Sequence, residues 1–125
     1  MEKEYILHTA ETIRHQLVTL TPTNVLLSWG IESLAATLIQ DMAALKLKVN
    51  GRIHQGSVYI AYNEGVDYYE IFLGTAAGTR RIAEDVDFEQ LGDVIDRHIE
   101  SGDNPSEYDA FCESERQKLM RGDFS

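Results

Sequence analysis

Several residue types are scarce in this 125-residue chain, and each shortage argues against a class of protein. Cys112 is the single cysteine, which excludes an internal disulfide framework and fits a reducing compartment. No apolar run approaches the roughly 18 residues of a membrane span, and the charged first residues lack the hydrophobic block of a signal peptide. We therefore expect a cytoplasmic protein without a membrane partner.

Motifs of cofactor, metal and catalytic chemistry are also scarce. The sequence has no phosphate-binding glycine loop, no calcium-loop spacing and no catalytic triad. His8, Glu11 and His15 fall on one face of a predicted helix and could ligate zinc, but pairing between acid and histidine is the commoner role of such a face. We expect no cofactor, no metal and no catalytic residue, and hence a protein that is not an enzyme.

Basic residues are scarce in the second half of the chain. Residues 1–62 contain five acids and five bases, whereas residues 63–125 contain sixteen acids and six bases and so carry the whole net charge of −10. Such a field disfavours direct binding of nucleic acid or of an anionic membrane. It favours a protein partner with a basic surface.

One predicted helix concentrates this negative charge. Asp87 and Gln90 form a capping-box pattern at its start, and Gly102 ends it. Four acids recur at spacings of 4, 3 and 4 on one face: Glu89, Asp93, Asp96 and Glu100. We interpret the row as a candidate surface for a basic partner; the alternatives are a DNA-mimic inhibitor of a nucleic-acid-binding protein and a simple solvated face.

Apolar periodicity predicts an α+β fold. Residues 3–20 have a helical stripe that could pack on the sheet or against its twin in a dimer. From residue 43 onwards the period becomes two, which predicts an antiparallel meander of four to six strands. A further helix is predicted from Asn104 to about Arg121, so that residues 1–125 form one domain with residues 103–125 as a peripheral helix and tail.

Residues 22–40 are ambiguous. Thr21 and Pro22 could begin a helix, with Leu20 and Val25 as its hydrophobic staple. Residues 24–31 nevertheless alternate apolar and other residues as a strand does, which slightly favours a strand. In either case we expect the segment to be buried on nearly all sides.

Two turns set the predicted strand registers. Asn50-Gly51 predicts a tight hairpin, and a bulge near Gln55-Gly56 would bring Ile53 into phase with the core residues that follow. A turn around Glu64-Gly65 would place Ile60 opposite Tyr69.

This second hairpin gives the sheet an unusually aromatic second face. Tyr59, Tyr68 and Phe72 are expected on it, with Tyr59 and Tyr68 as diagonal neighbours, while Tyr69 faces the core. The protein's own chain could cover this face, or it could bind a partner, including a second copy; a base-stacking platform would need a more basic surrounding.

The sequence thus predicts a small acidic interaction protein rather than an enzyme. We expect it to self-associate as a homodimer and to bind a basic protein partner. The candidate partner-binding residues are Tyr59, Tyr68, Phe72, Glu89, Asp93, Asp96 and Glu100. The remaining alternative is a small enzyme or ligand-binding domain with a pocket near the hairpin tyrosines and His54.

Overall fold

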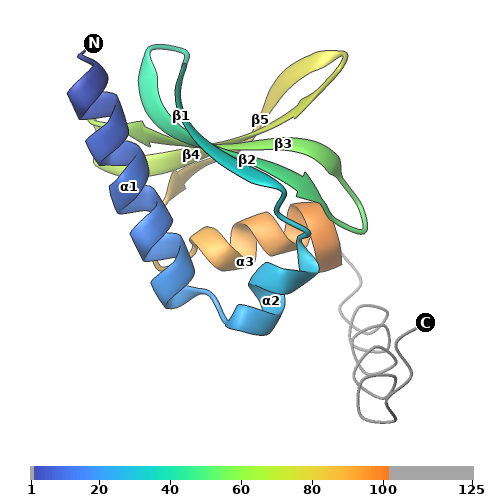
Figure 1. The fold of residues 1–125 in the computed structure, drawn as a ribbon. Coiled ribbons are helices and arrows are strands. Elements are labelled where there is room, and N and C mark those ends of the chain that lie inside the picture. The colour runs from blue at the N-terminus through green and yellow to red at the C-terminus, as the bar shows by residue number, and fades with distance from the viewer. Residues whose placement is uncertain (1, 102–125) are drawn as a thin grey trace, which may run out of the picture.

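The computed structural model describes residues 2–101 and confirms the α+β fold (Figure 1). Two helices precede a five-stranded sheet, and a helix that ends in a π-helical turn follows it. The elements in order are α1 (Lys3–Leu20), α2 (Thr23–Ser28), β1 (Ser33–Ile39), β2 (Met42–Asn50), β3 (Gln55–Asn63), β4 (Tyr68–Thr75), β5 (Gly78–Val86), α3 (Leu91–Asp96) and η1 (Arg97–Ser101). The helix predicted from Asn104 lies outside the described residues.

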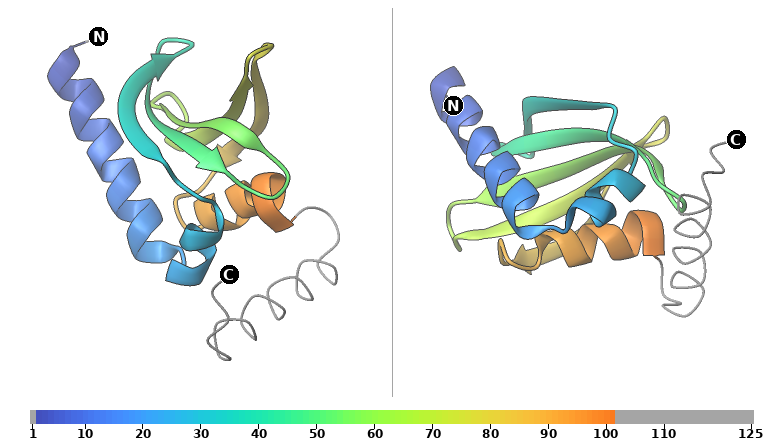
Figure 2. Two further views of the ribbon diagram at one scale, coloured as in Figure 1. Left: turned by 45° about the vertical axis from the view of Figure 1, so that its right-hand side comes forward. Right: turned by 60° about the horizontal axis from the view of Figure 1, so that its bottom comes forward.

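The sheet is an antiparallel meander in which every strand pairs with its neighbours in the chain. Within the described residues, α1, α2 and α3 contribute to one hydrophobic core with a single face of this sheet. Figure 2 shows α1 and α3 packed beside that face, while the tips of the β1–β2 and β4–β5 hairpins point away from α3. The stripe of α1 packs on the sheet through Ala10, Ile13 and Leu17, each at most 4% exposed.

The prediction of a strand at residues 24–31 is wrong. Residues 23–28 form α2, with Pro22 as the N-cap, whose carbonyl oxygen accepts from the backbone N–H groups of Val25 and Leu26 at 3.0 and 3.1 Å. Trp29 follows as the largest fully buried side chain, and its indole nitrogen donates to Asp96 Oδ1 at 2.9 Å. Burial of the segment was also overestimated, since the side chain of Leu27 is 76% exposed.

The first hairpin has a turn that the sequence did not signal. Ile39 pairs with Met42, so Gln40 and Asp41 alone form the turn, and both have positive φ angles of 49° and 64°. Two consecutive residues with positive φ define the type I′ turn, which favours asparagine and glycine. Because the sequence has neither here, the turn and the strand β1 before it were not expected.

The prediction of a tight turn at Asn50-Gly51 is wrong, as is that of a bulge after it. Asn50 pairs with Gln55 across a four-residue loop, and the β2–β3 register continues without a shift. Residues of this loop contact η1: the backbone N–H groups of Ile53 and His54 donate to the carbonyl oxygen of Ile99, at 2.8 and 3.3 Å. Ile53 is 48% exposed in the loop and does not join the core.

The register of the β3–β4 hairpin is shifted by two residues from the prediction. Ile60 pairs with Ile71 and Tyr62 with Tyr69, because the turn spans four residues, 64–67, rather than two. Side chains alternate with a period of two along a strand, so a two-residue shift leaves each side chain on its predicted face. Tyr69 is therefore on the core face, as expected, at 7% exposure.

The C-terminal helix begins later than predicted. The capping-box pair forms, with Gln90 Oε1 accepting from the backbone N–H of Asp87 at 3.2 Å, but it closes a turn before α3 begins at Leu91. The apolar period of this segment predicts a buried stripe of four residues, Phe88, Leu91, Ile95 and Ile99. The last three are fully buried, whereas Phe88 is 42% exposed. The turn thus leaves an aromatic side chain at the surface.

Glu100 is buried beneath the loop between β2 and β3, at 3% exposure. Its Oε2 accepts from the backbone N–H of Arg52 at 2.6 Å, and its carbonyl oxygen accepts from Arg52 Nε at 2.8 Å. Burial raises the pKa of the Glu100 carboxyl, and the hydrogen bond from Arg52 opposes this effect. The carboxylate therefore has a structural role in joining η1 to the sheet.

Glutamine at position 100 is expected to stabilise the protein more at neutral pH than at acid pH. The raised pKa of Glu100 means that its carboxyl binds a proton more tightly in the folded state than in the unfolded state. The wild-type protein therefore has this contribution to its stability at low pH and loses it as pH rises through the folded-state pKa, whereas glutamine does not titrate. The difference in free energy of unfolding between Glu100→Gln and wild type should increase between about pH 4 and about pH 7. Urea unfolding at several pH values measures it; a constant difference would contradict this effect of burial.

Candidate functional site

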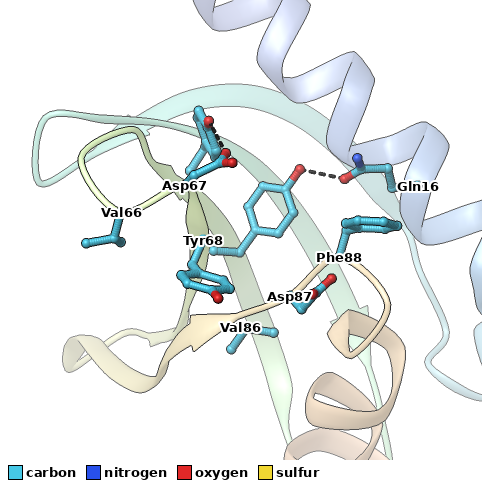
Figure 3. A pocket seen from close by; sticks show the side chains of 9 residues that line it. Gln16, Val66, Asp67, Tyr68, Val86, Asp87 and Phe88 are labelled. Atoms are coloured by element: carbon cyan, nitrogen blue, oxygen red, sulfur yellow. Dashed lines mark hydrogen bonds between the residues drawn. The ribbon is translucent and has the colours of Figure 1, made fainter.

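A cavity of about 480 Å³ opens where the β3–β4 turn, the end of β5 and α1 meet (Figure 3). Its volume lies within the range of about 300–1,000 Å³ that is typical of ligand sites. We call it the acid–aromatic pocket, because carboxylates and rings make up most of its lining. It is lined by Gln16, Tyr62, Val66, Asp67, Tyr68, Tyr69, Val86, Asp87 and Phe88.

The β3–β4 turn positions one side of the pocket. The side-chain Oδ1 of Asn63 accepts a hydrogen bond from the backbone N–H of Gly65 at 3.0 Å. The backbone carbonyl oxygen of Asn63 accepts from the backbone N–H of Asp67 at 2.9 Å. Asp67 itself has a φ of 56°, a conformation that aspartate and asparagine tolerate better than most residues. The turn therefore holds Val66, Asp67 and Tyr68 in succession along the rim.

The chain between β5 and α3 positions the opposite side. Val86 pairs with Tyr69 at the end of β5, and Asp87 Oδ1 accepts from the backbone N–H of Glu89 at 3.1 Å. This contact holds the turn in which Phe88 stays exposed. Figure 3 shows Tyr68 and Phe88 on opposite sides of the opening, with Asp87 between them in that view.

Hydrogen bonds fix two tyrosines of the lining. Tyr69 donates to Gln16 Oε1 of α1, and Tyr62 donates to Asp67 Oδ1, each at 2.5 Å. The bond to Asp67 raises the pKa of Tyr62 to about 12, with smaller contributions from burial and from the nearby negative charge. The Tyr62 hydroxyl therefore keeps its proton at neutral pH and acts as the donor in this hydrogen bond.

A second cavity of about 340 Å³ adjoins the pocket along α1 and shares Gln16, Tyr62, Asp67 and Tyr69 with it. Here Tyr5 donates a short hydrogen bond to the carboxylate of Glu64. The aromatic and acidic lining thus extends from the β5 end of the pocket towards the start of α1.

The chemistry of the acid–aromatic pocket is one-sided. Its nine lining residues include two carboxylates and four aromatic rings but no lysine, arginine or histidine. Within the described residues, neither Asp67 nor Asp87 forms an ion pair. A cation in the pocket would be attracted both by the charge of the carboxylates and by the faces of the aromatic rings. The arrangement therefore suits a positively charged side chain or ligand.

Of the three aromatic residues predicted to form one surface, the structure keeps Tyr59 and Phe72 together and separates Tyr68 from them. Phe72 is fully buried among side chains of the strands, and it pairs with Tyr59. Tyr59 is half-buried, with Lys46 Nζ 5.8 Å from the centre of its ring. Tyr68 pairs with Asn63 and is 43% exposed at the pocket, so the predicted diagonal contact with Tyr59 is absent.

The predicted acidic row is also divided. Glu89 and Asp93 are exposed, as the row requires. Asp96 accepts the hydrogen bond of Trp29, and Glu100 is buried against Arg52, so these two carboxylates hold the fold together. The expectation of four acids on one solvent-facing row is therefore wrong, because η1 turns its end towards the β2–β3 loop.

Most of the pocket was missed at the level of sequence. The two-residue turn expected at Glu64-Gly65 made Val66 and Asp67 strand residues, opposite Asn63 and Tyr62, and Phe88 was placed in the core stripe. The four-residue turn brings Asp67 to the rim, and the turn after β5 leaves Phe88 exposed; both depend on registers that the hydrophobic pattern alone does not define. Tyr68 is the one predicted site residue in the pocket.

The other candidate sites do not coincide with the pocket. His54 lines a separate cavity of about 270 Å³ with Thr75 and Arg80, away from the tyrosine pocket expected beside it. Glu11 forms an ion pair with Arg14 at 2.9 Å rather than grouping with His8 and His15. In residues 2–101, no three or more histidine, cysteine, aspartate or glutamate side chains are placed to hold a metal ion.

No family model matches this chain, and searches of curated proteins and of solved structures find no significant similarity. None of the helices in the described part of the chain combines the length and apolar character that a membrane crossing requires.

Proposed function

We propose that this is a non-enzymatic interaction protein that binds a basic protein partner by taking an arginine or lysine side chain into the acid–aromatic pocket. The observation that carries the proposal is the lining itself, which combines two carboxylates with four aromatic rings and, among residues 2–101, has no basic residue. A cation on a flexible apolar stem matches both features, because its charge meets Asp67 and Asp87 while its stem contacts the rings.

The exposed apolar rim supports a protein partner rather than a free ion. Val66, Tyr68 and Phe88 are between 42% and 51% exposed around the opening. Exposed aromatic and aliphatic side chains around a pocket are typical of the anchor region of a protein interface. A polypeptide that inserts one basic side chain would cover this rim with its neighbouring residues.

The acidic second half of the chain contributes at longer range. Residues 63–125 have a net charge of −10, and Glu89 and Asp93 are exposed close in sequence to Asp87. Such a field increases the association rate of a basic partner more than it increases contact energy. We therefore assign recognition to the pocket and steering to the surrounding charge.

Peptide binding tests this proposal. The probe is a fluorescein-labelled glycine–serine peptide with three arginines; matched peptides contain lysine or glutamate at the same positions. We expect fluorescence anisotropy to show saturable binding of the arginine or the lysine peptide and no binding of the glutamate peptide. The affinity for the basic peptide should fall as salt is added. Equal binding of the glutamate peptide, or no binding of either basic peptide, would reject the proposed function.

A further inference from the structure

The strand β1 is an unprotected edge of the sheet. It pairs with β2 only, and no other segment of the described chain pairs with its free side (Figure 2). Its seven residues include no charge and no proline, and its pairing with β2 runs without a bulge. Leu34 and Leu38 are 46% and 44% exposed on it. A regular, uncharged edge of this kind presents free backbone groups to another strand.

The opposite edge of the same sheet is protected. β5 contains Arg80, Arg81, Glu84 and Asp85, and its pairing with β4 has register shifts. Charges and bulges on an edge strand are the features by which proteins prevent strand addition. The contrast identifies β1 as the edge that is open to pairing.

Next to this edge is an apolar groove of about 450 Å³ between β1 and the first half of α1. Ile6, Leu7, Ala36 and Leu38 line it, together with Lys3 and Thr37. Leu7 is 47% exposed there. An added strand would therefore bring its own side chains over an apolar surface as well as onto free backbone groups.

We propose that β1 pairs antiparallel with β1 of a second copy of this chain, so that two sheets join into one. A twofold axis through Ala36 would place Leu34 of one copy opposite Leu38 of the other, twice in the same interface. Both leucines are on the same side of the strand as Ala36, because side chains alternate along it. The seven-residue sequence is thus complementary to itself in the arrangement that a symmetric dimer requires.

Charge favours a second copy at this edge. A chain with a net charge of −10 repels its own copies over most of its surface, but residues 1–62, which include α1 and β1, have a net charge of zero. Pairing through β1 brings these neutral parts together and leaves β4 and β5 of each copy, which belong to the acidic half, on the far side of the sheet. The acid–aromatic pocket contains no residue of β1, so the dimer would carry two accessible pockets.

One seven-residue strand and one groove make a small interface compared with the roughly 1,200–2,000 Å² of stable complexes. We therefore expect a reversible dimer. Light scattering on the full chain should show a mass that rises with concentration towards twice the 14.1 kDa of the monomer. Leu38→Lys should return the mass to that of the monomer, because a charge on an edge strand prevents pairing. Thr79→Lys, the same residue type placed on the β5 edge, should leave the dimer unchanged.

A disulfide trap locates the contact even if Leu38→Lys fails to fold. In a Cys112→Ser background, Ala36→Cys would place two thiols across the twofold axis, at the Cα separation that a disulfide accepts. Mild oxidation should give a covalent dimer of Ala36→Cys and not of Thr79→Cys. A wild-type protein that is monomeric at every concentration would overturn the proposal, as would a dimer that Ala36→Cys does not trap.

Discussion

Replacement of both pocket carboxylates by asparagine, Asp67→Asn with Asp87→Asn, is expected to weaken binding of the arginine or lysine peptide about 30-fold. Each charge–charge contact in this partly enclosed site contributes about 1 kcal/mol, and 1.4 kcal/mol corresponds to a factor of ten in affinity. Asparagine at position 67 keeps the oxygen that accepts from the Tyr62 hydroxyl, and asparagine at position 87 keeps the oxygen that accepts from the backbone N–H of Glu89. It also tolerates the positive φ of residue 67. The variant therefore removes charge while the turns remain.

A matched variant separates the pocket from the general acidity of the chain. Glu89→Gln with Asp93→Asn also removes two negative charges, but from exposed positions that do not line the pocket. We expect it to reduce affinity less than about threefold, since exposed charges at a distance are largely screened at physiological salt. Equal losses in the two double variants would show that the peptide responds to net charge and not to the pocket.

Trp29→Ala is expected to lower the free energy of unfolding by about 3–5 kcal/mol, the cost typical of truncating a large buried aromatic side chain. Trp29 is fully buried between α2 and the core, so its removal leaves a cavity where these elements meet α3. Because small domains are stable by only about 5–15 kcal/mol, the loss is a large fraction of the total. Urea unfolding followed by circular dichroism measures it.

Trp29→Phe is the control for this substitution. It retains an aromatic ring but removes the indole N–H that donates to Asp96 Oδ1. We expect a loss of about 1.5–3 kcal/mol, the range for a hydrogen bond to a charged group, and so a smaller effect than that of alanine. A loss below 1 kcal/mol for Trp29→Ala would contradict the role of Trp29 as the centre of this packing.

The architecture was predictable from the sequence where apolar periodicity was long and regular. The stripe of α1 and the alternation through Leu45, Leu47 and Val49 define their elements without help from the rest of the chain. Residues 24–31 misled because α2 has only six residues, too few for a helical period to differ clearly from alternation. The turn at Gln40-Asp41 gave no signal, because glutamine is not typical of positive φ and the glycine that usually occupies the second position of a type I′ turn is missing.

The candidate site was predictable only in part. Tyr68 was identified because an aromatic residue on the second face of a sheet is unusual, but its partners depend on turn length. A register error of two residues left the core face intact and still moved Tyr59 away from Tyr68. Asp96 and Glu100 could not be recognised as structural, because their contacts with Trp29 and Arg52 join residues 67 and 48 positions apart in the chain.

The location of the bound peptide is the most direct test that the acid–aromatic pocket recognises a basic side chain. In an NMR titration of the ¹⁵N-labelled chain with the arginine or lysine peptide, whichever binds, the backbone amides of residues 66–69 and 86–88 should shift most. The amides of the β5 edge and of the exposed face around Asp93 should shift little. Largest shifts along residues 89–96, or small shifts spread over the acidic surface without a centre, would contradict the assignment of recognition to the pocket.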